Sequence, residues 1–133
     1  MTASSLPSDQ LFPQGKPAPA GSFTGQAYMH PLAPSSQLQS LAVTFEAEAR
    51  TNWHTHDVGQ LIVVTSGICV YQLEGQEPQT LKPGEAFFFE PGVNHWHGAT
   101  SEGPMTHIAV TPFNEAGEFV NWGAPVDEAT YTG

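Results

Sequence analysis

Short apolar runs separated by glycine and proline are the feature that most limits how this chain can fold. Leu41, Val43 and Phe45 alternate with small or polar residues, the period-two pattern of a strand with one buried face. Similar runs occupy residues 60–65, 68–73, 86–89, 95–99 and 105–112. The tail at 127–131 is the one segment that suggests a helix. The pattern predicts an all-β sandwich or barrel.

The chain divides into an N-terminal arm, residues 1–22, and one barrel domain, residues 23–133. The arm is rich in Ser, Pro, Gly, Ala and Gln, so it buries too little surface to fold by itself. We expect it to be disordered or docked on a neighbouring subunit. Residues 23–29 predict a weak first strand, which the prolines of the 30–34 stretch should end in an irregular connection.

The net charge of the chain limits which partners it is expected to bind. Thirteen acidic residues face three basic ones, giving a net charge of -10. Such a surface repels phosphate backbones and anionic lipids, so nucleic acid and membrane are poor partners, and a small molecule is expected instead. The N-terminus lacks a signal-peptide pattern and no stretch approaches a membrane span, so a cytoplasmic protein is expected. The single cysteine, Cys69, lies in an apolar run and is expected to be a buried core thiol.

Two histidine-rich segments predict a metal site. His54 and His56 are two residues apart, so on a strand both side chains point to one face. Gln60 follows across the Asp57–Gly59 turn, and His95 comes after a second turn downstream. Three imidazoles and an amide oxygen from two segments are what a transition-metal ion needs.

Two sets of residues resemble the conserved motifs of the cupin superfamily of β-barrels. They are Glu48 through His54, His56, Gln60 and Gly67, and then Gly84 through Pro91, Gly92 and His95. More narrowly, the runs WHTH at 53–56 and HWHGA at 95–99 are similar to a bacterial subgroup of small single-domain cupins. That subgroup includes manganese-dependent (R)-selective hydroxynitrile lyases, so the resemblance implies a single-domain cupin barrel and this activity on small aromatic cyanohydrins.

The chain departs from the general cupin pattern at three positions. Glu48 stands where most cupins have glycine, Gln60 where most have a glutamate ligand, and Ala99 where an asparagine is usual. The subgroup shares the glutamine. Since a neutral amide replaces a carboxylate, the bound ion should keep more positive charge and act as a stronger Lewis acid. The resemblance implies manganese as the first expectation, with iron, nickel, cobalt or zinc as alternatives.

The strand at 105–112 should supply the rest of the pocket. His107, Ala109 and Thr111 share one face, which the resemblance places inside the barrel beside the metal. His107 is then the candidate catalytic base, or alternatively a structural hydrogen-bonding residue. His97 is expected in the pocket wall rather than on the ion. The expected lining also includes the core candidates Leu41, Val43, Phe45, Ile62, Val64, Phe87 and Phe89.

Other functions stay open from the sequence. An iron, nickel or manganese dioxygenase or isomerase would use the same ligands on a small aromatic or sugar-derived substrate. A non-enzymatic cupin would use the barrel to bind a small ligand. The apolar strands and the extended arm predict a homodimer or homotetramer.

Overall fold

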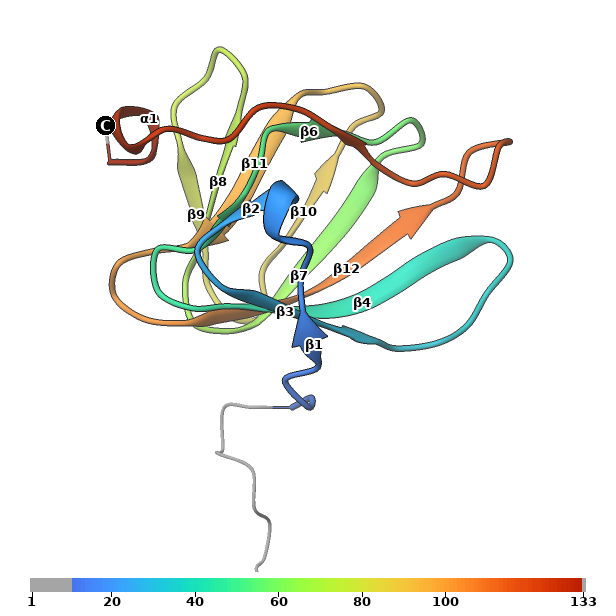
Figure 1. The fold of residues 1–133 in the computed structure, drawn as a ribbon, viewed down its shortest axis with the longest axis horizontal. Helices are drawn as coiled ribbons and strands as arrows, with labels where there is room; N and C mark the ends of the chain where they lie inside the picture. Colours follow the sequence, from blue (N-terminus) through green and yellow to red (C-terminus); the bar gives the residue numbers. More distant parts are fainter. Residues whose placement is uncertain (1–10, 133) are drawn as a thin grey trace, which may run out of the picture.

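The computed structural model describes residues 11–132, which form two facing β-sheets and one short helix (Figure 1). The first sheet runs, in spatial order, β1 (Lys16–Pro17), β3 (Ala27–Pro31), β4 (Leu38–Phe45), β12 (Met105–Pro112), β7 (Gln60–Ser66) and β10 (Ala86–Phe89). The second runs β13 (Asn121–Trp122), β6 (His54–Thr55), β11 (His95–Ala99), β5 (Arg50–Thr51) and β2 (Phe23–Thr24). From this second sheet, β8 (Cys69–Leu73) pairs with β11 and β9 (Gln79–Leu81). A 3-10 turn (Ala20–Ser22) and helix α1 (Glu128–Thr132) complete the fold.

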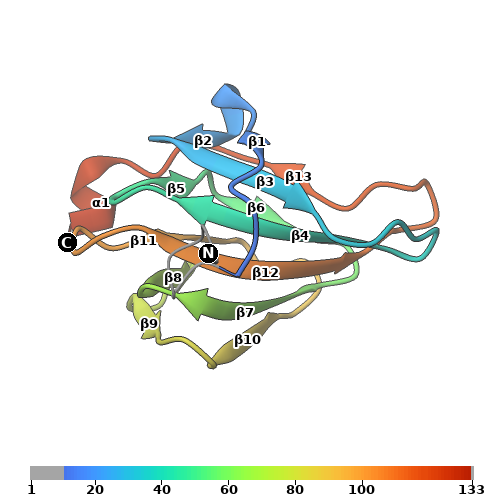
Figure 2. The same ribbon diagram turned by 90° about the horizontal axis from the view of Figure 1, so that it is seen from below.

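The long strands of the first sheet follow the period-two pattern of the sequence. In β12 every second side chain, from Met105 to Thr111, is buried, while the residues between them are half-buried. The register places His107 opposite Val43 on β4 and Val64 on β7. Figure 2 shows β4, β12, β7 and β10 side by side. Their inward faces supply most of the apolar core, as the alternation predicted.

Gly59 makes the turn that brings Gln60 to the start of β7. Its φ is 91°, a left-handed conformation that glycine adopts without steric cost. A Cβ atom at this position would lie 2.5 Å from the Phe88 ring and 2.8 Å from the Phe89 carbonyl oxygen. The turn therefore needs glycine for both its dihedral angle and its space.

Most strand predictions are confirmed, and three are corrected. The strand predicted over residues 23–29 is two strands in different sheets, β2 in the second and β3 in the first, and Gly25 between them has a φ of 82°. β4 begins at Leu38, three residues before the first alternating position, because Gln39 and Ser40 pair with β12 although they carry no apolar signal. β3 continues through Pro31, where an irregular connection was predicted. Among residues 11–132, the pairing of β3 with β1 involves only residues 28 and 29, so Pro31, which cannot donate a backbone hydrogen bond, lies beyond that ladder.

Part of the segment expected to be an arm packs against the barrel of its own chain. β1 pairs with β3, and the Ala18 amide donates to the Ala27 carbonyl oxygen at 2.8 Å. The Asn52 amide donates to the carbonyl oxygen of Ser22 at 2.8 Å. Residues 1–10 of the predicted arm lie outside the described residues.

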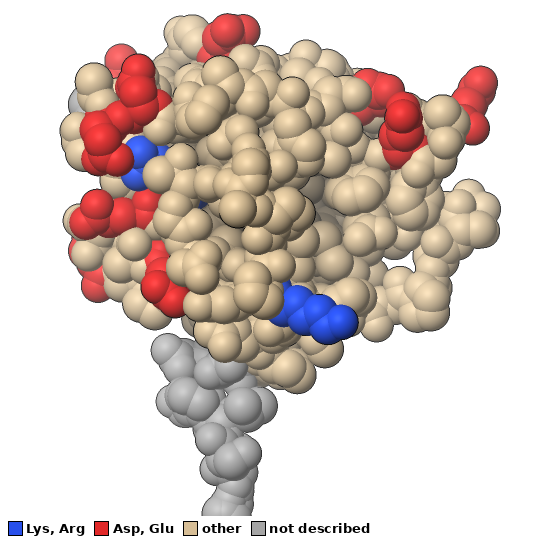
Figure 3. Space-filling view, viewed as in Figure 1, with Lys and Arg blue, Asp and Glu red and all other residues tan. Residues whose placement is uncertain are grey.

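The interior and the surface agree with the expectations from composition. Cys69 is fully buried, and burial raises the pKa of its thiol to about 12, which favours the unreactive protonated form. Acidic side chains make up most of the charged surface in Figure 3. Among residues 11–132 we find no helix of the length and apolar character that crossing a membrane requires.

Candidate metal centre

Three histidines converge between β6 and β11. The register pairs His54 on β6 with His95 on β11. Their ring centroids lie 4.3 Å apart, and the His56 ring lies 4.8 Å from His54 and 5.3 Å from His95. All three side chains are buried. The structure thus brings together the three imidazoles that the sequence singled out.

A backbone carbonyl fixes the tautomer of each of these rings. His54 Nδ1 lies 2.8 Å from the Asn52 oxygen, His56 Nδ1 2.7 Å from that of Phe119, and His95 Nδ1 2.9 Å from that of Val93. A carbonyl oxygen only accepts, so each Nδ1 carries the proton and each Nε2 keeps a lone pair. The Nε2 atoms of His56 and His95 are buried without a hydrogen-bond partner among the described residues. Buried lone pairs of this kind fit a metal ion.

Gln60 presents its carbonyl oxygen in the same way. Its Nε2 donates to Thr111 Oγ1 on β12 at 2.9 Å, and its Oε1 is buried without a partner among residues 11–132. The Thr111 contact occupies the amide nitrogen, which leaves the oxygen available as a ligand. The four predicted ligands therefore all offer an atom suited to a divalent ion.

His97 and His107 form a hydrogen-bonded pair across the barrel. His107 Nε2 lies 3.0 Å from His97 Nδ1, and both side chains are buried. The outer nitrogens, His97 Nε2 and His107 Nδ1, have no partner among the described residues. One nitrogen of the pair must donate to the other, so the pair has two tautomeric arrangements that differ in which outer nitrogen keeps a lone pair.

Burial keeps all five of these imidazoles neutral near pH 7. It is the main cause that lowers the pKa of His95 to about 3 and that of His107 to about 4. Burial likewise lowers the pKa of His56, and it lowers those of His54 and His97 well below the usual value, with neighbouring histidines adding to the effect. Unlike a protonated imidazole, a neutral one does not repel a cation by its charge, and it keeps the lone pair that binds the cation.

A second grouping shares two of these residues. One ring nitrogen from each of His54, His95 and His97 lies within 4.8 Å of the other two. His97, however, already uses Nδ1 in its contact with His107. The described residues thus offer a histidine triad that could hold a metal in His54, His95 and His97, and the predicted ligand His56 lies beside it with its ring 4.8 Å from that of His54.

One cavity joins the site to the apolar interior. Of the predicted site residues, it is lined by His54, His56, Gln60, His97, His107, Leu41, Val43 and Thr111. His95 is fully buried and absent from the lining, because the His54 and Phe89 rings pack against it at 4.3 and 3.7 Å. Of the other expected lining residues, Phe45 lines the cavity, while Ile62, Val64 and Phe89 belong to the core behind it and Phe87 packs against that core.

The sequence interpretation missed part of the cavity wall. Phe119, Val120 and Trp122 line it from the segment after β12, and Phe23 and Met29 line it from the N-terminal strands. The cluster of apolar residues at 119–122 in an otherwise polar tail was the available signal. It was too short to show a period.

Fold and site together define a cupin, and comparison with known proteins agrees. The cupin domain family model matches residues 41–111, and the chain belongs to this family. A cupin-like protein from Thermotoga maritima superimposes with a TM-score of 0.86 at 32% identity, over 92% of this chain and 95% of that one. A cupin 2 conserved barrel domain protein from Rhodopseudomonas palustris shares the fold at 12% identity, with a TM-score of 0.68 over 82% and 76% of the two chains.

Among characterised relatives, an (R)-mandelonitrile lyase from Granulicella tundricola is 42% identical over 116 residues. The match spans 85% of this chain and 88% of that protein. The resemblance to the hydroxynitrile lyase subgroup that the sequence motifs carry is thereby confirmed.

Proposed function

We propose that this cupin is a metal-dependent hydroxynitrile lyase that cleaves or forms small aromatic cyanohydrins. The observation that carries the proposal is the set of buried, unpartnered ligand atoms of His56, His95 and Gln60 beside the lone pair of His54. The 42% identity to an (R)-mandelonitrile lyase supports the choice of reaction.

His54, His56, Gln60 and His95 would hold the ion, with manganese as the first expectation and iron, nickel, cobalt or zinc as alternatives. When bound, a divalent ion supplies Lewis-acid stabilisation of the substrate oxygen or of the departing cyanide. Because all four ligands are neutral, none of them cancels the charge of the ion. This distinguishes the site from a cupin in which a glutamate occupies the place of Gln60.

His107 takes the hydroxyl proton of the cyanohydrin. Its lone pair lies on Nδ1 when its Nε2–H donates to His97 Nδ1 across their 3.0 Å contact. Loss of the proton converts the C–O bond into the carbonyl of the aldehyde, and the bond to the nitrile carbon breaks with its electron pair on cyanide. Cyanide then takes the proton back and leaves as hydrogen cyanide, which restores the neutral imidazole.

Apolar side chains would hold the aromatic ring of the substrate. Leu41 and Val43 line the cavity from β4, and Phe45 and Trp122 line it from opposite sheets. These groups can exclude water from the carbanion-like cyanide and set which face of the aldehyde is exposed. Thr111 is engaged with Gln60, so its part in the pocket is to hold that ligand.

Benzaldehyde release from mandelonitrile tests the proposal. The full chain is loaded with manganese, and release is followed against the same protein stripped with a chelator. We expect release only from the loaded protein, without oxygen uptake. Oxygen consumption with an aromatic substrate would favour a dioxygenase, and loaded protein no faster than stripped protein would exclude the lyase.

We also propose that two copies associate through the outer face of the first sheet. Leu61 and Phe88 are directly paired there and are 36% and 42% exposed. The half-buried Val110 is the next residue in the same row. An apolar row on a sheet face fits a homodimer, or a homotetramer built from dimers, which sedimentation equilibrium distinguishes from a monomer. A small-molecule substrate and no nucleic-acid or membrane partner remain predictions from the charge, and a cytoplasmic location remains a prediction from the lack of a signal-peptide or membrane-span pattern in the sequence.

A further inference from the structure

Residues 119–128 run antiparallel to residues 50–57, the segment that carries His54 and His56. β13 pairs with β6, with Trp122 opposite His54. The Gly123 amide donates to the Trp53 carbonyl oxygen at 2.7 Å, and the Trp53 amide donates to that of Ala124 at 2.9 Å. Figure 1 shows this part of the chain crossing over β6 on its way to α1. We call residues 119–128 the C-terminal strap.

The strap contacts the groups that orient both histidines. The Phe119 carbonyl oxygen is the partner of His56 Nδ1, at 2.7 Å. Asn52, whose carbonyl oxygen accepts from His54 Nδ1, donates its own side-chain amide to the Gly123 oxygen at 3.1 Å. The Trp122 ring also packs 4.9 Å from the His54 ring. The directions of both Nε2 lone pairs therefore depend on where the strap lies.

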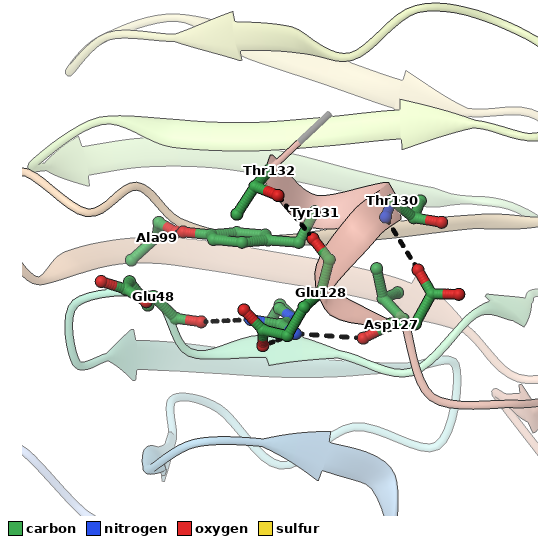
Figure 4. Close-up of polar contacts among 9 residues, drawn as sticks. Glu48, Ala99, Asp127, Glu128, Thr130, Tyr131 and Thr132 are labelled. Carbon is green, nitrogen blue, oxygen red and sulfur yellow. Dashed lines mark hydrogen bonds and ion pairs between the residues drawn. The ribbon is translucent and has the colours of Figure 1, made fainter.

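A buried arginine fixes the far end of the strap. Arg50 is 2% exposed and donates to the Glu48 carbonyl oxygen at 3.2 Å and to the Val126 carbonyl oxygen at 3.1 Å. It also pairs with Glu128 Oε2 at 2.6 Å. Figure 4 shows Glu48 at one end of these contacts and the Glu128 side chain reaching into them from α1. Glu48 has a φ of 69°, an unusual conformation that the Arg50 contact helps to hold.

Tyr131 completes this attachment. Its ring lies 4.3 Å from the Arg50 guanidinium carbon, and its hydroxyl donates to the Ala99 carbonyl oxygen at 2.6 Å on β11 (Figure 4). β11 is the strand that carries His95. We call Arg50, Val126, Glu128 and Tyr131 the C-terminal latch.

The members of the latch should contribute unequally to holding the strap in place. The Glu128 side chain is 72% exposed, so water screens its ion pair with Arg50. Val126 is 2% exposed, and its carbonyl oxygen meets Arg50 away from water. A buried guanidinium without partners is costly, so Arg50 favours the state in which the strap is attached. Arg50 and Tyr131 should therefore matter more than Glu128.

We infer that the latch controls metal retention, with Arg50 and Tyr131 as positioning residues that act through the strap on His54 and His56. The inference rests on the proposed function for the presence of the ion. The strap and α1 lie beyond residues 41–111, the part of the chain that the family model matches. Arg50, which lies within the matched residues 41–111, thus holds a C-terminal segment that lies beyond them.

Manganese release tests the inference in the full chain. The loaded protein is mixed with excess chelator, and the rate of manganese loss is compared among Arg50→Lys, Tyr131→Phe and Glu128→Gln. Tyr28→Phe is the matched control, because it also removes one hydroxyl contact, the 2.8 Å bond to Glu46. Outer contacts of ligand histidines typically change metal affinity by about 10- to 100-fold. We expect release about tenfold faster in Arg50→Lys and a few-fold faster in Tyr131→Phe, with Glu128→Gln and Tyr28→Phe near wild type.

Hydrogen exchange of the metal-free variants gives a second readout. The amide of Gly123 should exchange faster in Arg50→Lys and Tyr131→Phe, and at the wild-type rate in Tyr28→Phe. Faster exchange together with faster release supports the inference. Unchanged release, or release that rises equally in Tyr28→Phe, overturns it. If the wild type takes up no manganese, the proposed function fails, and unchanged exchange at Gly123 would separately show that the latch does not hold the strap.

Discussion

The two sheets of this barrel are held together by different interactions. The first sheet has strands of up to eight residues, and β12 pairs along its whole length with β4. In the second sheet, β5, β6 and β13 have two residues each. Side chains such as Asn52 and Arg50 supply there the contacts that long ladders supply in the first sheet.

Because of this difference, the two sheets should contribute unequally to folding stability and to metal binding. The first sheet carries most of the apolar core and contributes Gln60 and His107 from long, regular strands. The second sheet carries His54 on the two-residue β6 and His95 on the five-residue β11, and His56 follows just after β6. Core changes in the first sheet should alter mainly stability, whereas changes around the short strands should alter mainly the metal site.

Loss of a ligand from the second sheet should have the largest effect. In His54→Ala or His95→Ala we expect metal content to fall from about one ion per chain to near zero and lyase activity to drop by about 1,000-fold or more. Elemental analysis and benzaldehyde release measure the two. The control is His30→Ala, since His30 lies on β3 outside the cavity lining. Full metal content in His54→Ala would contradict the proposed ligand set.

The His97–His107 pair tests which sheet supplies the base. In His107→Gln we expect kcat to fall about 100-fold with metal content unchanged, because general-base catalysis is typically worth that much or more. In His97→Gln the fall should be smaller. The reverse order would assign the proton transfer to His97 Nε2, the outer nitrogen of the other tautomeric arrangement.

Gln60→Glu changes the charge of the site without removing a ligand. We expect the ion to be retained and kcat to drop about tenfold, because a carboxylate reduces the Lewis acidity of the ion. Gln79→Glu adds the same charge at an exposed position of β9 and serves as the control. Unchanged activity in Gln60→Glu would break the link between the neutral amide and the lyase reaction.

The buried histidines should make the metal-free protein sensitive to acid. Burial lowers their pKa values, to about 3 for His95 and about 4 for His107, so between pH 6.5 and 4 the unfolded chain binds more protons than the folded one. Stability is therefore complete above pH 6.5 and is lost as the pH falls, by up to about 1.4 kcal/mol per pH unit for each such histidine. Urea midpoints at pH 7 and pH 5 measure this, and equal midpoints would contradict it.

Ile62→Val in the first sheet should have the smallest effect. Ile62 is fully buried in the core, so we expect a loss of about 1 kcal/mol in unfolding free energy. Manganese release should keep the wild-type rate, because Ile62 does not line the cavity. A large change in release would show that the two sheets are more tightly coupled than their contacts suggest.

The sequence by itself determined the strands and most of the site. Short apolar runs bounded by glycine and proline located β7, β10, β11 and β12 to within a residue or so, because turn residues mark where each strand ends. The spacing of His54 and His56, with Gln60 after a glycine turn, was enough to predict that these donors meet. Local geometry decides such features, so local sequence reveals them.

Only the tertiary structure decided what surrounds the ligands. Two-residue strands such as β6 and β13 are too short to show a period, and their pairing brings Phe119 and Trp122 to the histidines from more than 60 positions away in the chain. The contact of His97 with His107 likewise joins two strands whose relative position depends on closure of the barrel. Long-range packing sets these contacts, and no spacing within one segment of the sequence encodes them.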